Sequence, residues 1–129
     1  LHDVMDQTKS NDRMTLTLAL SYGSREEITK TIKEISHKVK NNLISPGEID
    51  ESVINNHLYT QNLPDVDLLI RTSGEQRISN FLLWQIAYAE LYFTETLWPD
   101  YTKNHLFEAI LNYQNRERRF GKTSEQLEQ

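Results

Sequence analysis

The chain has 129 residues, a formal net charge of −5 and 37% hydrophobic residues, as expected for one soluble domain that is long enough to bury a core. Its pI near 5.3 argues against nucleic acid as a partner, because nucleic acid requires a basic face. There is no cysteine, which excludes disulfides, thiol nucleophiles and thiolate metal sites and favours an intracellular setting.

Three segments in the first third of the chain have clear patterns. The opening LHDVMDQTKS has no initiating methionine and resembles the middle of a helix, so we expect the chain to be part of a longer protein. Residues 14–22, MTLTLALSY, alternate threonine with leucine and then become apolar, which predicts a buried strand. In residues 23–43, apolar side chains recur at helical spacing and predict one amphipathic helix; they are Ile28, Ile32, Ile35, Val39 and Leu43.

The remaining elements alternate between helix and strand. In SPGEIDESVINNHLY, Ser45 and Asp50 are both suited to capping a helix start. Residues 67–72, DLLIRT, predict a second buried strand, and NFLLWQIAYA after it predicts a largely buried helix. A short strand at ELYFT, a turn at WPDY and an amphipathic helix in LFEAILNYQNRERRF follow. This order predicts an α/β fold with a mostly parallel sheet flanked by helices.

The segment RTSGEQRISN, residues 71–80, is the first candidate site. It joins a predicted strand to a predicted helix, and ligands of open α/β sheets bind at such positions. Arg71 and Arg77 supply forked positive charge suited to phosphate, Gly74 allows close backbone approach, and Ser79 is placed to cap the next helix. The alternative is an exposed turn in which Glu75 neutralises one arginine.

Three blocks of the sequence carry a resemblance to a known family. The long block DLLIRTSGEQRISNFLLWQIAYAELYFTETLWPDY resembles the cis-prenyltransferases, specifically the bacterial undecaprenyl diphosphate synthases. ALSYGSREEI resembles a second family block, and NRERRFG resembles the carboxyl-terminal signature in which arginine and glycine flank one residue, here Arg119 and Gly121. The resemblance spans the whole chain and implies the carboxyl-terminal portion of one catalytic domain.

The resemblance implies a reaction and a set of substrate-binding residues. Such enzymes join isopentenyl diphosphate to an allylic diphosphate, usually farnesyl diphosphate, and make the lipid carrier for cell-wall polysaccharides such as peptidoglycan. It assigns the isopentenyl diphosphate site to Arg71, Arg77 and Ser79, with a backbone contribution from Ile78. The family often has histidine where this chain has Gln76, which can donate a hydrogen bond but cannot titrate.

Glu90 is open to two interpretations. A carboxylate within AYAELYF is costly to bury unpaired, and from the residues alone an arginine partner is favoured over a metal. The resemblance implies Mg²⁺ instead, an ion that takes few carboxylates and completes its coordination with water and phosphate oxygens.

The resemblance also implies what must be supplied from outside this chain. The family's catalytic aspartate lies in an amino-terminal motif that is absent here, so we expect no catalytic residue in the chain and no turnover by it alone. A homodimer is implied, with residues 81–93 at the interface and residues 119–121 reaching the partner's active site. The product partitions into membranes, yet FLLWQIAYA is too short to span one, so we expect a cytoplasmic protein, peripheral at the membrane's inner face.

Two other functions are compatible with the residues. One is a non-catalytic accessory subunit of a heteromeric cis-prenyltransferase, although such subunits tend to lose the residues that are present here in RTSGEQRIS. The other is an unrelated α/β regulatory domain that binds phosphate.

Overall fold

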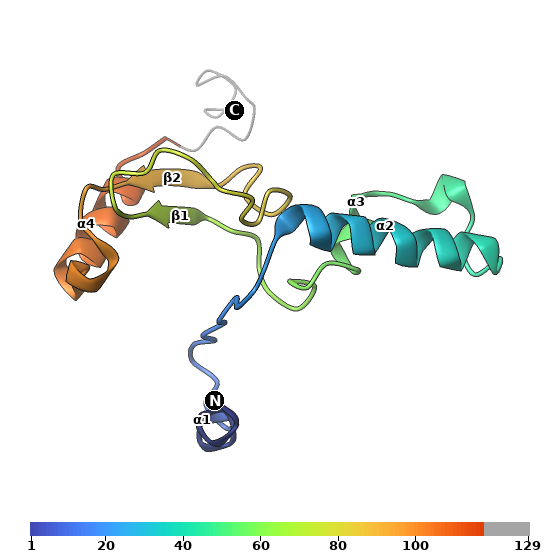
Figure 1. The fold of residues 1–129 in the computed structure, drawn as a ribbon, viewed down its shortest axis with the longest axis horizontal. Coiled ribbons are helices and arrows are strands. Elements are labelled where there is room, and N and C mark those ends of the chain that lie inside the picture. Colours follow the sequence, from blue (N-terminus) through green and yellow to red (C-terminus); the bar gives the residue numbers. More distant parts are fainter. Residues whose placement is uncertain (118–129) are drawn as a thin grey trace.

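A computed structural model describes residues 1–117. Its helices are α1 (His2–Thr8), α2 (Ser24–Lys40), α3 (Glu51–Asn55) and α4 (Lys103–Gln114), and its strands are β1 (Leu68–Arg71) and β2 (Glu90–Phe93). Short 3₁₀ turns lie at Pro46–Glu48 and Trp98–Asp100. Along the long axis, α2 and α3 lie at one end and the sheet with α4 at the other, while α1 lies apart from both (Figure 1).

The sheet in the described residues has two parallel strands. Leu68 pairs with Glu90 and Arg71 pairs with Phe93, so both strands end at the same edge. Leu69 is buried at the centre of β1, and α4 packs against β2. The predicted strands at DLLIRT and ELYFT and the predicted carboxyl-terminal helix are therefore confirmed, as is the α/β class with parallel strands and flanking helices.

The two predicted helix starts in the middle of the chain are also confirmed. The Ser45 side chain and Glu48 form a capping box around the first 3₁₀ turn, with the Ser45 N–H donating to Glu48 Oε2 at 2.6 Å. Asp50 caps α3 by accepting from the Val53 N–H at 2.8 Å. Both caps satisfy backbone groups that a helix start leaves open.

The predicted strand at residues 14–22 is wrong for the described chain. These residues have no regular secondary structure and pair with no strand of residues 1–117, and Met14, Leu16, Leu18 and Leu20 are all exposed. Sequence pattern alone cannot form a strand, because its backbone hydrogen bonds must come from a neighbour.

The predicted helix at NFLLWQIAYA is wrong as well. Residues 79–88 form a series of turns and bends, in which Ser79, Asn80 and Leu82 have positive φ angles of 54°, 61° and 48°. Such left-handed residues cannot continue an α-helix. Ile86 is nevertheless buried, as are the apolar side chains of Ile35, Leu58, Leu69 and Ala109.

The buried face of α2 differs from the predicted apolar stripe. Ile35 is buried, but Ile32 is 59% exposed, while Glu27 and Thr31 are 1% and 2% exposed. The Thr31 hydroxyl donates to the His57 carbonyl at 3.1 Å, so this polar side chain is satisfied where it is buried.

Candidate functional site

The loop after β1 is held against the residues that follow β2. The Ser73 N–H donates to the Thr96 carbonyl at 2.8 Å, and the Gly74 N–H donates to the Thr94 carbonyl at 2.9 Å. In return the Thr94 N–H donates to the Arg71 carbonyl at 2.9 Å. These bonds extend the pairing beyond the strands and hold the loop at the carboxyl edge of the sheet, where α/β proteins bind ligands.

Gly74 is required by the geometry of this loop. Its φ angle is +67°, and a Cβ at this position would lie 2.5 Å from the Glu95 Oε2 atom. A side chain here would add backbone strain and a steric clash. The sequence predicts that Gly74 allows a close approach of the backbone. In the structure, the neighbour that comes close is Glu95, in the segment after β2.

Arg71 lies at the end of β1 with a half-buried side chain. Its Nε atom is buried and has no hydrogen-bond partner among the described residues. A buried donor without a partner is rare and costly, and a phosphate oxygen would supply the missing acceptor. This orphaned donor fits the anion-binding role predicted for Arg71.

Arg77 and Ser79 lie together in the second half of the loop. The Arg77 Nε donates to Ser79 Oγ at 3.1 Å, and the guanidinium also pairs with Glu75. The Arg77 side chain is 63% exposed, so this ion pair contributes little and its charge remains available to a ligand. Gln76 is exposed and Ile78 is half-buried between these residues.

Ser79 does not cap a helix, contrary to the sequence-based prediction, because no helix follows it. The adjacent Asn80 caps α2 from a distance instead. Its carbonyl accepts from the Ser24 N–H and its Oδ1 accepts from the Arg25 N–H, both at 2.9 Å. The Leu83 N–H then donates to Ser24 Oγ at 3.0 Å. These bonds fasten the loop of residues 71–80 to the start of α2, and they occupy the first N–H groups of that helix.

A buried carboxylate behind this junction escaped the sequence analysis. Glu27 Oε1 accepts from the Tyr59 N–H at 2.7 Å, and Oε2 accepts from the Tyr22 hydroxyl at 2.5 Å and from Gln85 Nε2 at 3.1 Å. Burial, followed by the hydrogen bond to Glu27, raises the pKa of Tyr22 to about 12. Glu27 is therefore a structural residue that joins α2 to the preceding Tyr22 and to two distant segments at Tyr59 and Gln85. Its position in the first turn of a helix does not by itself indicate such burial.

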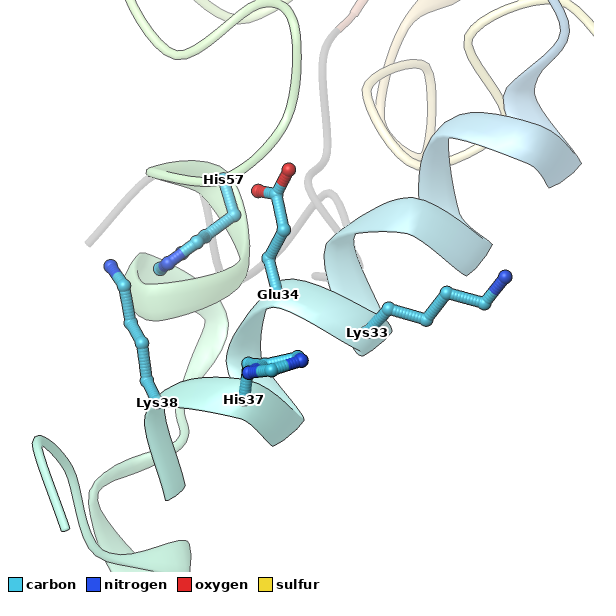
Figure 2. A pocket seen from close by; sticks show the side chains of 5 residues that line it. All are labelled: Lys33, Glu34, His37, Lys38 and His57. Atoms are coloured by element: carbon cyan, nitrogen blue, oxygen red, sulfur yellow. The ribbon is translucent and has the colours of Figure 1, made fainter. Parts of the chain in front are cut away.

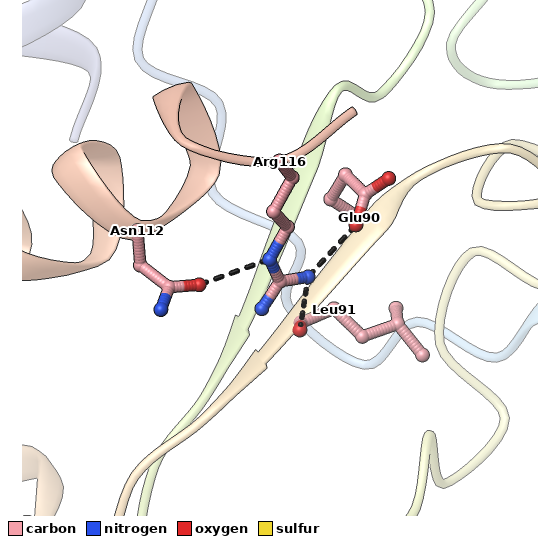
Figure 3. Close-up of polar contacts among 4 residues, drawn as sticks. All are labelled: Glu90, Leu91, Asn112 and Arg116. Atoms are coloured by element: carbon pink, nitrogen blue, oxygen red, sulfur yellow. Dashed lines mark hydrogen bonds and ion pairs between the residues drawn. The ribbon is translucent and has the colours of Figure 1, made fainter. Parts of the chain in front are cut away.

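Glu90 is paired with an arginine in this chain (Figure 3). Arg116 Nη1 lies 2.8 Å from Glu90 Oε2 and also donates to the Leu91 carbonyl at 2.9 Å, while Nε donates to Asn112 Oδ1 at 2.9 Å. Glu90 stands at the amino end of β2, opposite Leu68. It is about 10 Å along the strands, three residues at ~3.3 Å each, from the edge that carries Arg71.

The donor chemistry at Glu90 is compatible with Mg²⁺ as one ligand among several. Magnesium is held by one or two carboxylates while waters and substrate phosphates complete the shell. Among residues 1–117 no group of three His, Cys, Asp or Glu side chains could hold a metal ion. Glu90 could thus be one ligand of an ion whose other ligands come from outside residues 1–117, and Arg116 would have to release Oε2 or share the carboxylate.

The remaining predicted site residues, Arg119 and Gly121, lie outside the described residues. Within the described part, the structure brings Arg77 and Ser79 into direct contact and joins their loop to α2. It leaves Glu90 at the other end of the strand pair.

Comparisons with known proteins show which family the chain resembles. The prenyltransferase family model described as undecaprenyl diphosphate synthase matches residues 1–121. An isoprenyl transferase of Chlorobaculum tepidum is 53% identical over 98% of this chain and 48% of its own length. A farnesyl-diphosphate-specific ditrans,polycis-undecaprenyl-diphosphate synthase of Haemophilus influenzae is 55% identical over 90% of the chain and 48% of its own.

A solved structure shows the same relation in three dimensions. The crystal structure of lavandulyl diphosphate synthase from Lavandula x intermedia, in complex with dimethylallyl diphosphate, matches with a TM-score of 0.88 and 40% identity. The match covers 94% of this chain and 52% of that protein. The chain therefore spans about half the length of the relatives it matches.

Proposed function

Because the chain belongs to the undecaprenyl diphosphate synthase family of prenyltransferases, we propose that the protein of which it forms part condenses isopentenyl diphosphate with an allylic diphosphate. We further propose farnesyl diphosphate as the allylic substrate and undecaprenyl diphosphate, the cell-wall lipid carrier, as the product. The observation that carries the proposal is the arginine-bearing loop after β1, which is fastened at both ends.

The loop suits the diphosphate of isopentenyl diphosphate. Arg71 contributes a buried Nε donor that has no partner among the described residues, and Arg77 contributes an exposed guanidinium that is oriented by Ser79 at 3.1 Å. Gln76 adds an exposed amide donor and Ile78 its backbone. Two forked cations with hydroxyl and amide donors recognise a diphosphate through charge-assisted hydrogen bonds. In the reaction this loop would hold isopentenyl diphosphate in position, while the diphosphate group departs from the allylic substrate.

We assign the metal role to Glu90, with Mg²⁺ as the cofactor. When bound, the ion would neutralise diphosphate charge and assist departure of the allylic leaving group. The contribution of the chain would be to hold one carboxylate at the start of β2, while Arg116, 2.8 Å away, orients that carboxylate in the absence of the metal.

The rest of the proposal concerns the complete protein. We propose that the catalytic aspartate and allylic site belong to the half of the family's length that this chain does not span, so that this chain alone does not turn over. We also propose a homodimer with residues 81–93 at the interface and with Arg119 and Gly121 near the partner's site. No helix within residues 1–117 is long and apolar enough to cross a membrane; we place the protein in the cytoplasm, peripheral to the membrane that receives its product.

Steady-state kinetics of the complete protein test the loop assignment. Arg71→Ala and Arg77→Ala should each raise the KM for isopentenyl diphosphate by about tenfold or more, since a charge-assisted hydrogen bond is worth about 1.5–3 kcal/mol. The KM for farnesyl diphosphate should change little. Arg77→Lys, which keeps charge but loses the fork, should be intermediate, and Lys103→Ala on α4 serves as the charge-matched control. Equal effects on both substrates would show that the loop serves another site, and absence of condensation by the wild type would favour an accessory subunit.

A further inference from the structure

The loop of residues 71–80 is attached to two different parts of the chain. Its first half is bonded to the segment after β2 through the N–H groups of Ser73 and Gly74. Its second half, which carries Arg77, is bonded to the start of α2 through Asn80. A binding side chain needs supporting contacts that hold it in the productive direction, so the attachment to α2 bears directly on Arg77.

Asn80 meets the start of α2 with both its backbone and its side chain. Its carbonyl accepts from the Ser24 N–H and its Oδ1 accepts from the Arg25 N–H, each at 2.9 Å. A Cβ at Gly23 would lie only 3.0 Å from the Asn80 Nδ2 atom, so the amide lies close against the residue that precedes the helix. Contacts with three consecutive residues thus fix the position of Asn80.

The backbone at this point adopts a conformation that needs support. Ser79 and Asn80 have φ angles of 54° and 61°, in the left-handed region that residues other than glycine seldom occupy. Such residues persist where the surrounding structure holds them. The two bonds from α2 provide this support for Asn80. Because the peptide bond between the two residues is planar, they also restrict the orientation of Ser79.

Ser79 transmits this restriction to Arg77. The Ser79 Oγ atom accepts from Arg77 Nε at 3.1 Å, and the guanidinium of Arg77 is mostly exposed, with Glu75 of the same loop as its ion-pair partner. An exposed arginine has many rotamers and loses that freedom when it binds a ligand. A hydrogen bond that orients the guanidinium before the substrate arrives reduces this loss and strengthens binding.

We propose that Asn80 is a positioning residue for isopentenyl diphosphate. Through its bonds to α2 it fixes Ser79, and Ser79 orients the guanidinium of Arg77 for the diphosphate. The inference rests on the proposed function of the loop and adds to it a residue that itself touches no substrate. Orientation of a binding group stabilises the bound substrate and the transition state alike, so the effect of Asn80 falls on KM and not on kcat.

Steady-state kinetics of the complete protein test this role. Asn80→Ala loses the Oδ1 acceptor and adopts positive φ less readily, so the KM for isopentenyl diphosphate should rise by about three- to tenfold, as for one neutral hydrogen bond. The kcat and the KM for farnesyl diphosphate should not change. Asn80→Gly keeps the left-handed backbone and loses only the side-chain bond; it covers the case in which Asn80→Ala does not fold, and should raise the same KM by about threefold. An unchanged KM in Asn80→Gly would overturn the proposal.

A double-mutant cycle separates positioning from general support of the fold. If Asn80 acts through Arg77, Asn80→Ala should change the KM for isopentenyl diphosphate by less than about twofold in a protein that already carries Arg77→Ala. Equal effects in both backgrounds would overturn the proposal. If Arg77→Ala by itself leaves this KM unchanged, the loop assignment fails and the role of Asn80 fails with it. A KM raised by Arg77→Ala but not by Asn80→Ala would overturn the role of Asn80 alone.

A matched control lies farther along α2. The Thr31 hydroxyl donates to the His57 carbonyl at 3.1 Å, a second bond between α2 and a distant segment. Figure 2 shows His57 beside the second half of α2, where it lines a hollow together with side chains of that helix. Thr31→Val removes this bond and should lower the urea midpoint, but the KM for isopentenyl diphosphate should stay within about twofold of the wild type. An equal rise of KM in Thr31→Val and Asn80→Ala would show that any loosening of α2 disturbs the loop, and would overturn the specific role of Asn80.

Discussion

Replacing Glu90 by glutamine separates the two roles that this residue can have. Glutamine keeps the shape and hydrogen-bonding capacity of the side chain but removes its negative charge. If Glu90 binds Mg²⁺, the substitution should change how the reaction rate depends on the metal. If Glu90 only pairs with Arg116, the substitution should lower the free energy of unfolding. The matched variant is Arg116→Gln, which removes the other half of the ion pair and leaves the carboxylate in place.

The geometry of the pair limits the cost to stability. Breaking a fully buried ion pair costs about 3–5 kcal/mol, but here the Glu90 and Arg116 side chains are 27% and 32% exposed. Arg116 also keeps its bonds to the Leu91 carbonyl and Asn112. We therefore expect each single variant to lower the free energy of unfolding by only about 0.5–1.5 kcal/mol, as for an ordinary hydrogen bond. Urea unfolding of this chain measures both values.

Magnesium titrations of the complete protein give the decisive comparison. Glu90→Gln should lose most turnover and require about tenfold more Mg²⁺ for half-maximal rate, with partial recovery at high metal, because one anionic ligand of the proposed ion is gone. Arg116→Gln should need no more Mg²⁺ than the wild type, since it removes a cation that competes for the same oxygen. Identical magnesium curves for wild type and Glu90→Gln, together with equal destabilisation of the two variants, would refute the metal assignment.

Three further outcomes are expected. Gly74→Ala should destabilise the chain by about 1–3 kcal/mol through positive φ and the clash it creates, whereas Gly47→Ala, with nothing within 4 Å of a new Cβ, should be nearly neutral in the same urea titration. Tyr22, whose pKa is raised to about 12 by burial, stays protonated in the folded chain while an unfolded tyrosine ionises near pH ~10. Its contribution to stability is thus complete below pH ~10 and is lost between about pH 10 and 12; unfolding measured across that range should show less alkaline loss for Tyr22→Phe. The complete protein should sediment as a dimer. The double change Phe81→Asp with Phe93→Asp should weaken this dimer, because both rings are exposed in this chain, at 39% and 38%, and can contact a second copy. A stable wild-type monomer at working concentration would contradict this.

Elements with local determinants could be predicted from the sequence. The apolar run before Arg71 and the run at ELYFT each carry enough β-forming residues to specify a short strand. Ser45 and Asp50 cap helix starts through bonds to residues three positions away, so the whole signal lies within one turn. Arg77 and Ser79 likewise meet within the loop in which they were predicted to act.

Elements that depend on distant neighbours could not be predicted in this way. Residues 14–22 have a strand pattern, yet the partner that would pair with them is absent from the described structure. Residues 80–89 are apolar enough for a buried helix, but Asn80 is held in a left-handed conformation by its bonds to Ser24 and Arg25. Those partners lie more than fifty residues away, and no periodicity within the segment reveals them.

The start of α2 connects the two wrongly predicted segments, residues 14–22 and 80–89, to the candidate site. Asn80 ends the loop of residues 71–80 and at the same time caps α2. Glu27, in the first turn of α2, bonds this helix to Tyr22 and Gln85. Any force that repositions α2 must therefore move the loop that carries Arg77. Tyr22 ends residues 14–22, so the segment whose strand prediction fails is tied to this same junction through its hydrogen bond to Glu27.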